Sequence, residues 1–324
     1  MNSIQTSVND LLSRQPKEWK LFKDNLDALN GVQTKRYQIG QFEIVAQFNP
    51  ARVVSTAAKV DKASIQKRKC FLCPEHLPAE QLRLPVLDGY QILCNPYPIF
   101  PNHLTIPTVQ HTPQSISPRI RALLELSSAL PLYTLFYNGP QCGASAPDHA
   151  HFQAAPFGLM PMDREVRSFC SPLYQQEETF LYKLCGYLRN GFVLTSTSID
   201  KLARLFHSLY MCLPQKEGKT EPMMNLFTHF EAGEYRLIVI PRKSHRPWQY
   251  QLEAGKEQFL SSPGAADIGG LFVTVRAEDF NRLSSALLED IYQQVCWGDS
   301  DINRMAACFL EKGCDLLENS SQCS

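Results

Sequence analysis

The sequence predicts an α+β protein made of two related halves. Segments with strand character alternate with segments of helical periodicity, and the second part of the chain repeats the alternation of the first. One stretch also recurs, because residues 103–111 and 236–245 both end with His four positions after Pro. Each copy follows a strand that contains asparagine, Asn95 or Asn225. Two copies are too few for a solenoid, so a pseudo-symmetric pair of α+β units is the simpler interpretation.

The first half is predicted to begin with two short helices and to continue with strands. Apolar spacing indicates the helices, period-two alternation indicates the strands, and prolines between Asn95 and Asn102 exclude helix or central strand there. In chain order, we expect two helices within residues 1–30, a hairpin over 37–48, a polar loop over 59–69, strands over 91–95 and 103–107, a helix over 116–130, and strands over 132–138 and 149–154.

The second half repeats strand, helix and hairpin. Ala232-Gly233 supplies the turn residues that a tight hairpin needs. In chain order, we expect a strand over 191–197, a helix over 199–213, a hairpin over 223–230 and 234–240, a strand over 269–275, and two C-terminal helices.

Size and charge exclude several classes of protein. The chain has 324 residues with 44% hydrophobic and 20% charged residues, which is typical of globular proteins rather than disordered ones. Its 32 Lys and Arg balance 32 Asp and Glu, so no basic excess for nucleic acid exists. The N-terminus lacks the apolar run of a signal peptide, and no stretch approaches the roughly 20 apolar residues of a membrane span. We therefore expect a cytoplasmic protein whose eleven cysteines are reduced.

The densest group of polar residues is His149-Ala150-His151-Phe152-Gln153. On a strand, alternate residues project from the same face, so both histidines and Gln153 would line one surface. A neutral imidazole there can attack phosphorus and form a labile phosphoramidate, and Gln153 could donate a hydrogen bond to a phosphoryl oxygen. The alternative is that both histidines are ordinary polar residues at a surface.

Cys70 and Cys73 are separated by two residues, a spacing that lets both thiolates bind one tetrahedral zinc ion. Two further ligands would be needed, and the sequence offers four histidines, of which one at a strand end and the first of the His-x-His pair are preferred. The alternatives are a redox dithiol, for which no thioredoxin-like βαβ pattern exists, and two ordinary buried cysteines. The candidate histidines are His76, His103, His111 and His149.

Other nucleotide-binding and hydrolase motifs fail on inspection. Gly218-Lys219-Thr220 lacks the glycine that a P-loop needs five positions earlier, where Leu213 stands. The segment around Ser145 lacks the second glycine of a nucleophile elbow. No Gly-x-Gly-x-x-Gly pattern occurs, which counts against a dinucleotide-binding dehydrogenase.

Taken in order, these segments resemble the histidine triad (HIT) superfamily, in the branch of galactose-1-phosphate uridylyltransferases, diadenosine tetraphosphate phosphorylases (ATP adenylyltransferases) and GDP-hexose phosphorylases. The resemblance spans roughly residues 41–283 and rests on an ordered set of short motifs. These are Cys70-x-x-Cys73, Asn95-Pro96-x-Pro98, Ile106-Pro107 with His111, His149-x-His151-x-Gln153, Met224-Asn225-Leu226-Phe227-Thr228, and Leu237 to Arg242. The resemblance implies two HIT-like halves, each a mainly antiparallel sheet with helices packed on it, over residues 1–190 and 191–324.

The resemblance also implies roles for individual residues. The middle histidine of the triad is the nucleophile, which corresponds to His151, and the glutamine that replaces the third histidine in this branch corresponds to Gln153. In metal-bearing members the ligands of a structural zinc correspond to Cys70, Cys73, His111 and His149, with His103 as the alternative to His111.

Residues expected to bind the nucleotide or its phosphates come from both halves. Asn138 and Ser145 match the Asn and Ser that precede the histidines in the superfamily, and Arg52 after Asn49-Pro50 is a candidate phosphate-binding arginine. Arg242 and Lys243 are candidates to neutralise phosphate oxygens, and the alternative for both is a solvated strand end.

The expected function is therefore two-step nucleotidyl transfer. His151 would attack the α-phosphorus of a nucleotide sugar or dinucleoside polyphosphate, and phosphate or a sugar phosphate would then accept the nucleotide. The second hypothesis is a hydrolase of the same superfamily, in which water discharges the adduct. The third is a non-catalytic, zinc-stabilised nucleotide-binding protein, for which replacement of His151 would leave nucleotide binding unchanged.

Overall fold

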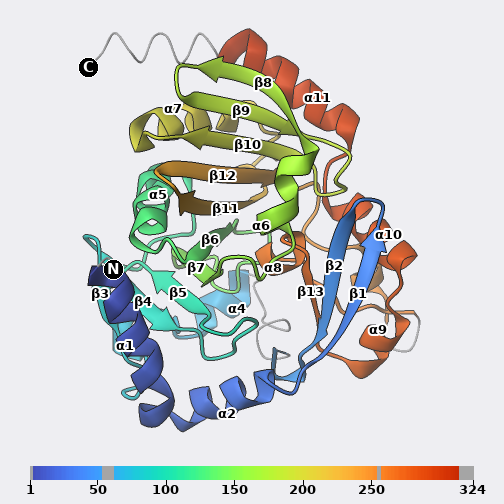
Figure 1. The fold of residues 1–324 in the computed structure, drawn as a ribbon. Helices are drawn as coiled ribbons and strands as arrows, with labels where there is room; N and C mark the ends of the chain where they lie inside the picture. Colours follow the sequence, from blue (N-terminus) through green and yellow to red (C-terminus); the bar gives the residue numbers. More distant parts are fainter. Residues whose placement is uncertain (1–2, 53–61, 254–256, 314–324) are drawn as a thin grey trace.

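The structure, a computed structural model, describes residues 3–52, 62–253 and 257–313. Its strands form a ten-stranded antiparallel sheet and a separate three-stranded sheet, and helices pack on both faces of the larger one (Figure 1). This arrangement confirms the predicted α+β class. Among the described residues, no helix combines the length and the apolar character needed to cross a membrane.

The ten-stranded sheet contains five strands from each part of the chain. Its spatial order is β3-β4-β5-β7-β6-β11-β12-β10-β9-β8. The strands are β3 Leu84–Val86, β4 Tyr90–Cys94, β5 Leu104–Pro107, β6 Tyr133–Asn138, β7 His151–Pro156, β8 Cys170–Gln176, β9 Thr179–Leu184, β10 Gly191–Ser196, β11 Met224–Glu231 and β12 Glu234–Pro241.

The two groups of strands have the same connectivity. In chain order the first is β3, β4, β5, helix α5 (Ile120–Ala129), β6 and β7, and the second is β8, β9, β10, helix α7 (Ile199–Tyr210), β11 and β12. The order across the sheet reads the same from either edge, and antiparallel pairing of β6 with β11 joins the groups. Two related halves therefore share one continuous sheet. Strands β8 and β9 pair with each other, and β9 pairs with β10, so both belong to the second group. The boundary between the two halves at residue 190 stays a prediction.

This connectivity corrects the predicted alignment of the halves. The repeated Pro-x-x-x-His stretch pairs residues 103–111, which contain β5, with residues 236–245, which contain β12. The topology instead matches β5 with β10, and β12 with β7, the strand that carries His151. The similarity between the two stretches reflects their shared strand-end composition, not equivalent places in the fold.

The three-stranded sheet contains β1 (Gln33–Ile39), β2 (Phe42–Phe48) and β13 (Leu271–Thr274). The predicted hairpin over residues 37–48 is confirmed as the antiparallel β1–β2 pair. The predicted strand over 269–275 forms, but it pairs in parallel with β2, so the C-terminal part of the chain returns to an N-terminal hairpin.

The helices are α1 Ser3–Glu18, α2 Lys20–Leu29, α4 Lys62–Lys67, α5, α6 Met162–Glu165, α7, α8 Ala265–Ile268, α9 Ala277–Arg282, α10 Ser285–Val295 and α11 Asp299–Cys308. Helix α4 corrects the predicted loop over residues 59–69, of which 59–61 lie outside the described residues. A charged, polar stretch without strong apolar spacing gave no helical signal there.

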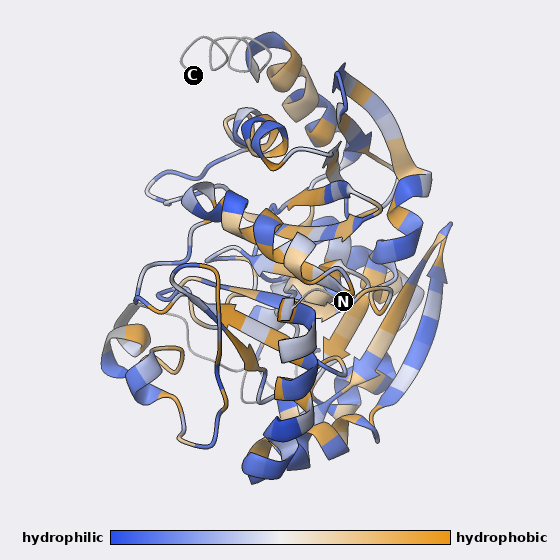
Figure 2. Ribbon diagram, turned by 60° about the vertical axis from the view of Figure 1, so that its left-hand side comes forward, coloured by the Kyte–Doolittle hydropathy of each residue, from blue (hydrophilic) through white to orange (hydrophobic). Residues whose placement is uncertain are grey.

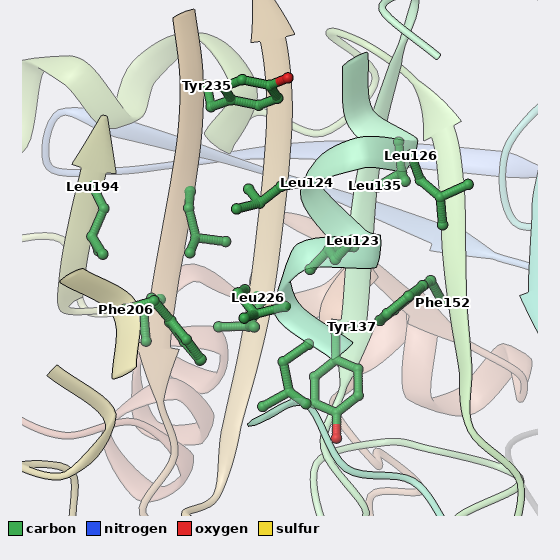
Figure 3. Packing of buried hydrophobic residues seen from close by; sticks show 14 of the residues in the cluster. Leu123, Leu124, Leu126, Leu135, Tyr137, Phe152, Leu194, Phe206, Leu226 and Tyr235 are labelled. Carbon is green, nitrogen blue, oxygen red and sulfur yellow. The ribbon is translucent and has the colours of Figure 1, made fainter. Parts of the chain in front are cut away.

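Apolar residues from α5 and α7 cover one face of the large sheet. Ser198 caps the N-terminus of helix α7, because its side chain accepts a hydrogen bond from the Lys201 amide. The helix buries Leu202, Phe206 and Leu209 at helical spacing. Figure 2 shows hydrophobic segments along the central strands and mixed hydrophobic and hydrophilic turns along the helices. In Figure 3, leucines of α5 lie over the side chains of β6, β7 and β11. The opposite face packs against the three-stranded sheet and α8 to α10, and it carries the polar residues described below.

Candidate active site

Strand β7 presents two of the predicted catalytic residues on the uncovered part of that opposite face. His151 pairs with Pro107 of β5, and Gln153 pairs with Thr105 of β5 and Phe136 of β6. His151 and Gln153 share a face, as period-two alternation predicts. His149 does not join them, because β7 begins at His151 and the residues before it form a turn. The expectation that all three residues line one surface is therefore wrong for His149.

A cavity of about 500 Å³ lies over this face of the sheet. This volume is within the range of roughly 300–1,000 Å³ that is typical of small-molecule sites. Both halves contribute to its walls. The predicted site residues that line it are Arg52, Asn138, Ser145, His151 and Gln153. Arg242 and Lys243 do not line it.

The imidazole of His151 is held with one nitrogen available to a ligand. Its Nδ1 lies 2.8 Å from the backbone oxygen of His149, and a carbonyl can only accept, so Nδ1 carries the proton. Nε2 then has a free lone pair, and the ring lines the cavity while being 4% exposed overall. Burial lowers the pKa of His151 to about 4, so the ring is neutral near pH 7. A neutral ring with a free Nε2 is the form that can act as a nucleophile.

Gln153 is oriented by a buried histidine. The Nε2 atom of His103 lies 2.9 Å from Oε1 of Gln153, and its Nδ1 accepts a hydrogen bond of 3.3 Å from the Ile99 amide. His103 is therefore protonated at Nε2 and donates to the amide oxygen of Gln153. The amino group of Gln153 takes no part in this bond and can donate to another acceptor. Burial, with a contribution from Arg52, lowers the pKa of His103 to about 3, so this tautomer is neutral.

This arrangement decides between the two histidines that the sequence left as alternative metal ligands. His103 is committed to Gln153 and Ile99, so it is not the fourth ligand. It instead belongs to the polar network beneath the cavity.

Gln114 connects β7 to β6 through hydrogen bonds to the backbone of both strands. Sequence analysis did not identify this residue. Its Nε2 donates to the backbone oxygens of Asn138 (2.9 Å) and His151 (3.0 Å), and its Oε1 accepts from the His151 amide (2.8 Å). The backbone position of His151 is thereby fixed from a loop outside the strands. Gln114 carried no motif, and only its three-dimensional position shows its role.

Asn138 connects the site to the C-terminal half. Its Oδ1 accepts hydrogen bonds from Asn225 Nδ2 (2.9 Å) and the Ala265 amide (2.7 Å). The loop that follows Asn138 also passes close to the segment that contains Gly264 and Ala265. A Cβ atom added at Gly143 would lie only 2.4 Å from the Cα of Gly264, and Gly143 has a φ of +98°. Glycine at 143 therefore permits the close approach.

Arg52 and Asp267 place opposite charges in the cavity wall. Arg52 donates to the backbone oxygen of Tyr97 (2.6 Å), and its buried Nε has no partner among the described residues. Burial lowers the pKa of Arg52 to about 10, and Asp267 opposes that shift. Burial raises the pKa of Asp267 to about 6 although backbone amides donate to it. Sequence analysis predicted Arg52 here and did not identify Asp267.

Arg242 lies beneath the site. Its side chain is 2% exposed, and all its nitrogens donate to neutral acceptors, namely Asn225 Oδ1 (2.6 Å) and the backbone oxygens of Ser244, His245, Pro263 and Val295. No donor is left for a phosphate. Lys243, the next residue, is exposed. The geometry therefore gives Arg242 a supporting position, through Asn225 and Asn138, rather than a direct one.

Cys70, Cys73, His111 and His149 come together as one cluster beside the cavity. One donor atom from each lies within 4.8 Å of the others. The Cys70 Sγ–His149 Nδ1 and Cys73 Sγ–His111 Nδ1 distances are 3.2 Å and 3.1 Å, and Cys73 Sγ lies 3.6 Å from His149 Nδ1. Zn–S bonds of about 2.3 Å and Zn–N bonds of about 2.0 Å at tetrahedral angles place S and N about 3.5 Å apart. The four residues could therefore bind a metal ion.

The surroundings of this cluster also suit a cation. The backbone oxygen of Thr108 lies 2.7 Å from Nε2 of His149, which keeps the proton there and turns Nδ1 toward the cysteines. Burial raises the pKa of the Cys73 thiol to about 12, so a thiolate at this position needs a positive charge beside it. The carboxylate of Asp148 lies 3.9 Å from His111 Nε2 and pairs with Arg68.

One protein family matches the N-terminal part of the chain. The family described as "Domain of unknown function (DUF4922)" matches residues 11–156, which include both cysteines of the cluster and β7. A comparison with curated proteins finds no match.

Solved structures of a yeast enzyme share the architecture. Yeast Ap4A phosphorylase Apa2 in complex with Ap4A superposes with a TM-score of 0.57 at 14% identity, covering 92% of this chain and 98% of that chain. The structure of the same enzyme with no ligand named gives a TM-score of 0.55 at 13% identity, with coverage of 92% and 98%. A galT-like protein from Arabidopsis thaliana gives a TM-score of 0.36 at 12% identity, with coverage of 80% and 99%. The chain therefore shares the fold of the yeast phosphorylase structures, which confirms the fold that the resemblance implies.

Proposed function

We propose that this protein is a nucleotidyltransferase or phosphorylase that acts on a nucleotide sugar or a dinucleoside polyphosphate through a nucleotide covalently bound to His151. The observation that carries the proposal is the neutral His151 ring, with its Nδ1 bonded to a backbone oxygen and its Nε2 free in a cavity of about 500 Å³. The shared fold with an enzyme described as an Ap4A phosphorylase supports the same class of reaction.

In the first step, His151 Nε2 forms a bond to the α-phosphorus and the bond from that phosphorus to the bridging oxygen breaks. The departing phosphate or sugar phosphate takes the electron pair. Gln153 donates its amino hydrogens to an α-phosphate oxygen, in the orientation that His103 fixes. Arg52, which lines the cavity, neutralises charge on the same group, and Asn138 and Ser145 line the phosphate's surroundings.

In the second step, phosphate or a sugar phosphate attacks the nucleotidyl-histidine and releases the nucleotide product. His151 then returns to its neutral form, since the nitrogen–phosphorus bond electrons return to Nε2. Orthophosphate as the acceptor would make the protein a phosphorylase.

The metal cluster has a structural role in this proposal. Cys70, Cys73, His111 and His149 hold a zinc ion that fixes the turn immediately before β7. Bound zinc would supply folding energy to the segment that positions His151, which carries out the chemistry itself. Residues from both HIT-like halves line the cavity and together form the site.

The test is to weigh the intact protein after incubation with ADP-glucose, GDP-mannose, UDP-glucose and Ap4A. Wild-type protein should gain the mass of one nucleotidyl group, a nucleoside monophosphate less one water, from at least one donor, and His151→Asn should gain none. His229→Asn is a matched control, because His229 is also buried on this face with its Nδ1 bonded to a backbone oxygen, yet does not line the cavity.

The fate of the adduct separates the alternatives. Discharge that requires phosphate and yields a nucleoside diphosphate indicates a phosphorylase, whereas discharge by water alone indicates the hydrolase. Nucleotide binding that His151→Asn leaves unchanged, with no adduct from any donor, would refute the proposal in favour of a non-catalytic binding protein.

A further inference from the structure

The wall of the cavity that comes from the C-terminal half carries one arginine, Arg246. Its Nε donates to Ser262 Oγ at 3.0 Å, and its guanidinium lies over the Tyr250 ring, with Cζ 4.0 Å from the ring centroid. Both contacts restrict the guanidinium plane before any ligand binds. Neither contact uses the two terminal nitrogens.

The positive charge of Arg246 is not compensated locally. Within the described part of the chain, its guanidinium contacts Ser262 and Tyr250, and no carboxylate is paired with it. Ser262 accepts from Arg246, and its Oγ also lies 3.1 Å from His245 Nε2. His245 is neutral, because burial and the nearby arginines lower its pKa to about 3. The only charge in this group is therefore the guanidinium.

The position of Arg246 follows from the strands and the segment that holds it. Ser262 is two residues before Gly264, which lies against Gly143, and the Ala265 amide bonds to Asn138. Asn138 ends β6, the strand that neighbours β7. Arg246 therefore stands on the β6 side of His151.

The opposite side of His151 has a different character. Strand β4 lies two strands away from β7, about 10 Å at the usual strand spacing. Leu93 of β4 lines the cavity there, and Pro96 and Tyr97 of the loop that follows β4 line it as well. These apolar and aromatic groups suit a nucleoside. Its phosphate then reaches His151, and the remainder of the substrate points toward Arg246.

We propose that Arg246 binds the anionic group that leaves the α-phosphorus, the phosphate or sugar phosphate beyond the bond that breaks; this inference rests on the proposed function. As Nε2 of His151 bonds to phosphorus, the bridging oxygen departs with the electron pair and gains negative charge. The two free nitrogens of Arg246 donate to this oxygen or to those of its phosphoryl group. The preferred substrates are thus nucleotides whose leaving group is itself a phosphate.

The test compares donors that differ only in the leaving group. The six probes are ADP-glucose, GDP-mannose and UDP-glucose, and the p-nitrophenyl esters of AMP, GMP and UMP. p-Nitrophenolate spreads its charge over a ring and has no phosphoryl oxygens for Arg246 to bind. The measurement is the single-turnover rate of adduct formation, followed by intact mass with full-length protein.

Arg246→Met should slow adduct formation from the nucleotide sugar by roughly 10²-fold or more, with little change for the matching p-nitrophenyl ester. Arg246→Lys should recover part of the rate with the nucleotide sugar. Arg282→Met is the matched control, since Arg282 belongs to the same half and lies near the Phe259 ring, and it does not line the cavity. Thermal unfolding checks that each variant is folded.

The possible failures are distinguishable. Equal slowing with both kinds of donor, or no slowing with either, would overturn the role of Arg246 and leave the proposed function intact. No adduct with wild-type protein from any of the six donors or from Ap4A would overturn the proposed function and this inference with it.

Discussion

The hydrogen bond between His103 and Gln153 provides a test of the site. His103 does not line the cavity, yet the proposed role of Gln153 in binding phosphate depends on the orientation that His103 gives it. Replacing His103 with leucine removes the Nε2 donor and leaves the Gln153 oxygen without its partner. The amide can then turn its oxygen, rather than its amino group, toward a phosphate. Repulsion between that oxygen and the phosphate would oppose the reaction.

The magnitude follows from the geometry. The bond is 2.9 Å long between two neutral groups, and His103 is 2% exposed. A buried acceptor left unpaired costs about 1–3 kcal/mol. If this cost falls on the transition state, adduct formation slows by roughly 5- to 150-fold. His103 also accepts from the Ile99 amide, so the variant should lose stability as well.

A double-mutant cycle separates these effects. The assay measures single-turnover adduct formation for His103→Leu, Gln153→Met and the double variant, with urea unfolding as the record of stability. If His103 acts through Gln153, its replacement slows the reaction in wild-type protein and has little further effect when Gln153 is already methionine. The same fold reduction in both backgrounds would refute the positioning role and leave only a general effect on folding.

Three further predictions concern the metal, a buried arginine and pH. Elemental analysis should find one zinc per chain, and chelation or Cys73→Ser should lower the free energy of unfolding by several kcal/mol; equal stability with and without metal would contradict a structural role. Arg242→Met should lower the free energy of unfolding by about 2–4 kcal/mol, because it leaves buried acceptors unpaired; undiminished stability with weaker nucleotide binding would instead support direct contact with substrate. The pKa of Asp267 is raised to about 6, above its value of about 3.9 in an unfolded chain, so its stabilising contribution is present at low pH and is lost as pH rises through about 6. Urea unfolding should therefore show wild type losing about 1 kcal/mol relative to Asp267→Asn between pH 5 and pH 7, and parallel pH profiles would argue against the shift.

Local patterns predicted much of the fold and the first members of the site. Period-two alternation placed His151 and Gln153 on one face, and strand register confirms it. Spacing identified Cys70 and Cys73 as a pair, and the structure brings both to one cluster. These features depend on residues within a few positions of each other, whose relative geometry the backbone largely determines.

Local patterns could not choose between two candidate residues whose neighbours in the sequence were alike. His103 precedes β5 and His111 follows it, and nothing nearby distinguishes a metal ligand from a hydrogen-bond donor to Gln153. The two Pro-x-x-x-His stretches misled the alignment of the halves for the same reason. The ends of different strands share a similar composition, so similar composition does not show that two strands are equivalent in the fold.

By itself, the amino-acid sequence determined the α+β class, the face shared by His151 and Gln153, and the cysteine pair, because backbone periodicity and short spacings set these geometries. Only the tertiary structure decided which histidine joins the cysteines, that Gln114 and His103 orient the reactive pair, that Arg242 lies below the cavity, and that Arg246 and Asp267 enter its wall. Those contacts join segments up to more than a hundred residues apart, such as Asn138 and Ala265. Which distant segments meet depends on how whole elements pack, and no local pattern encodes that choice.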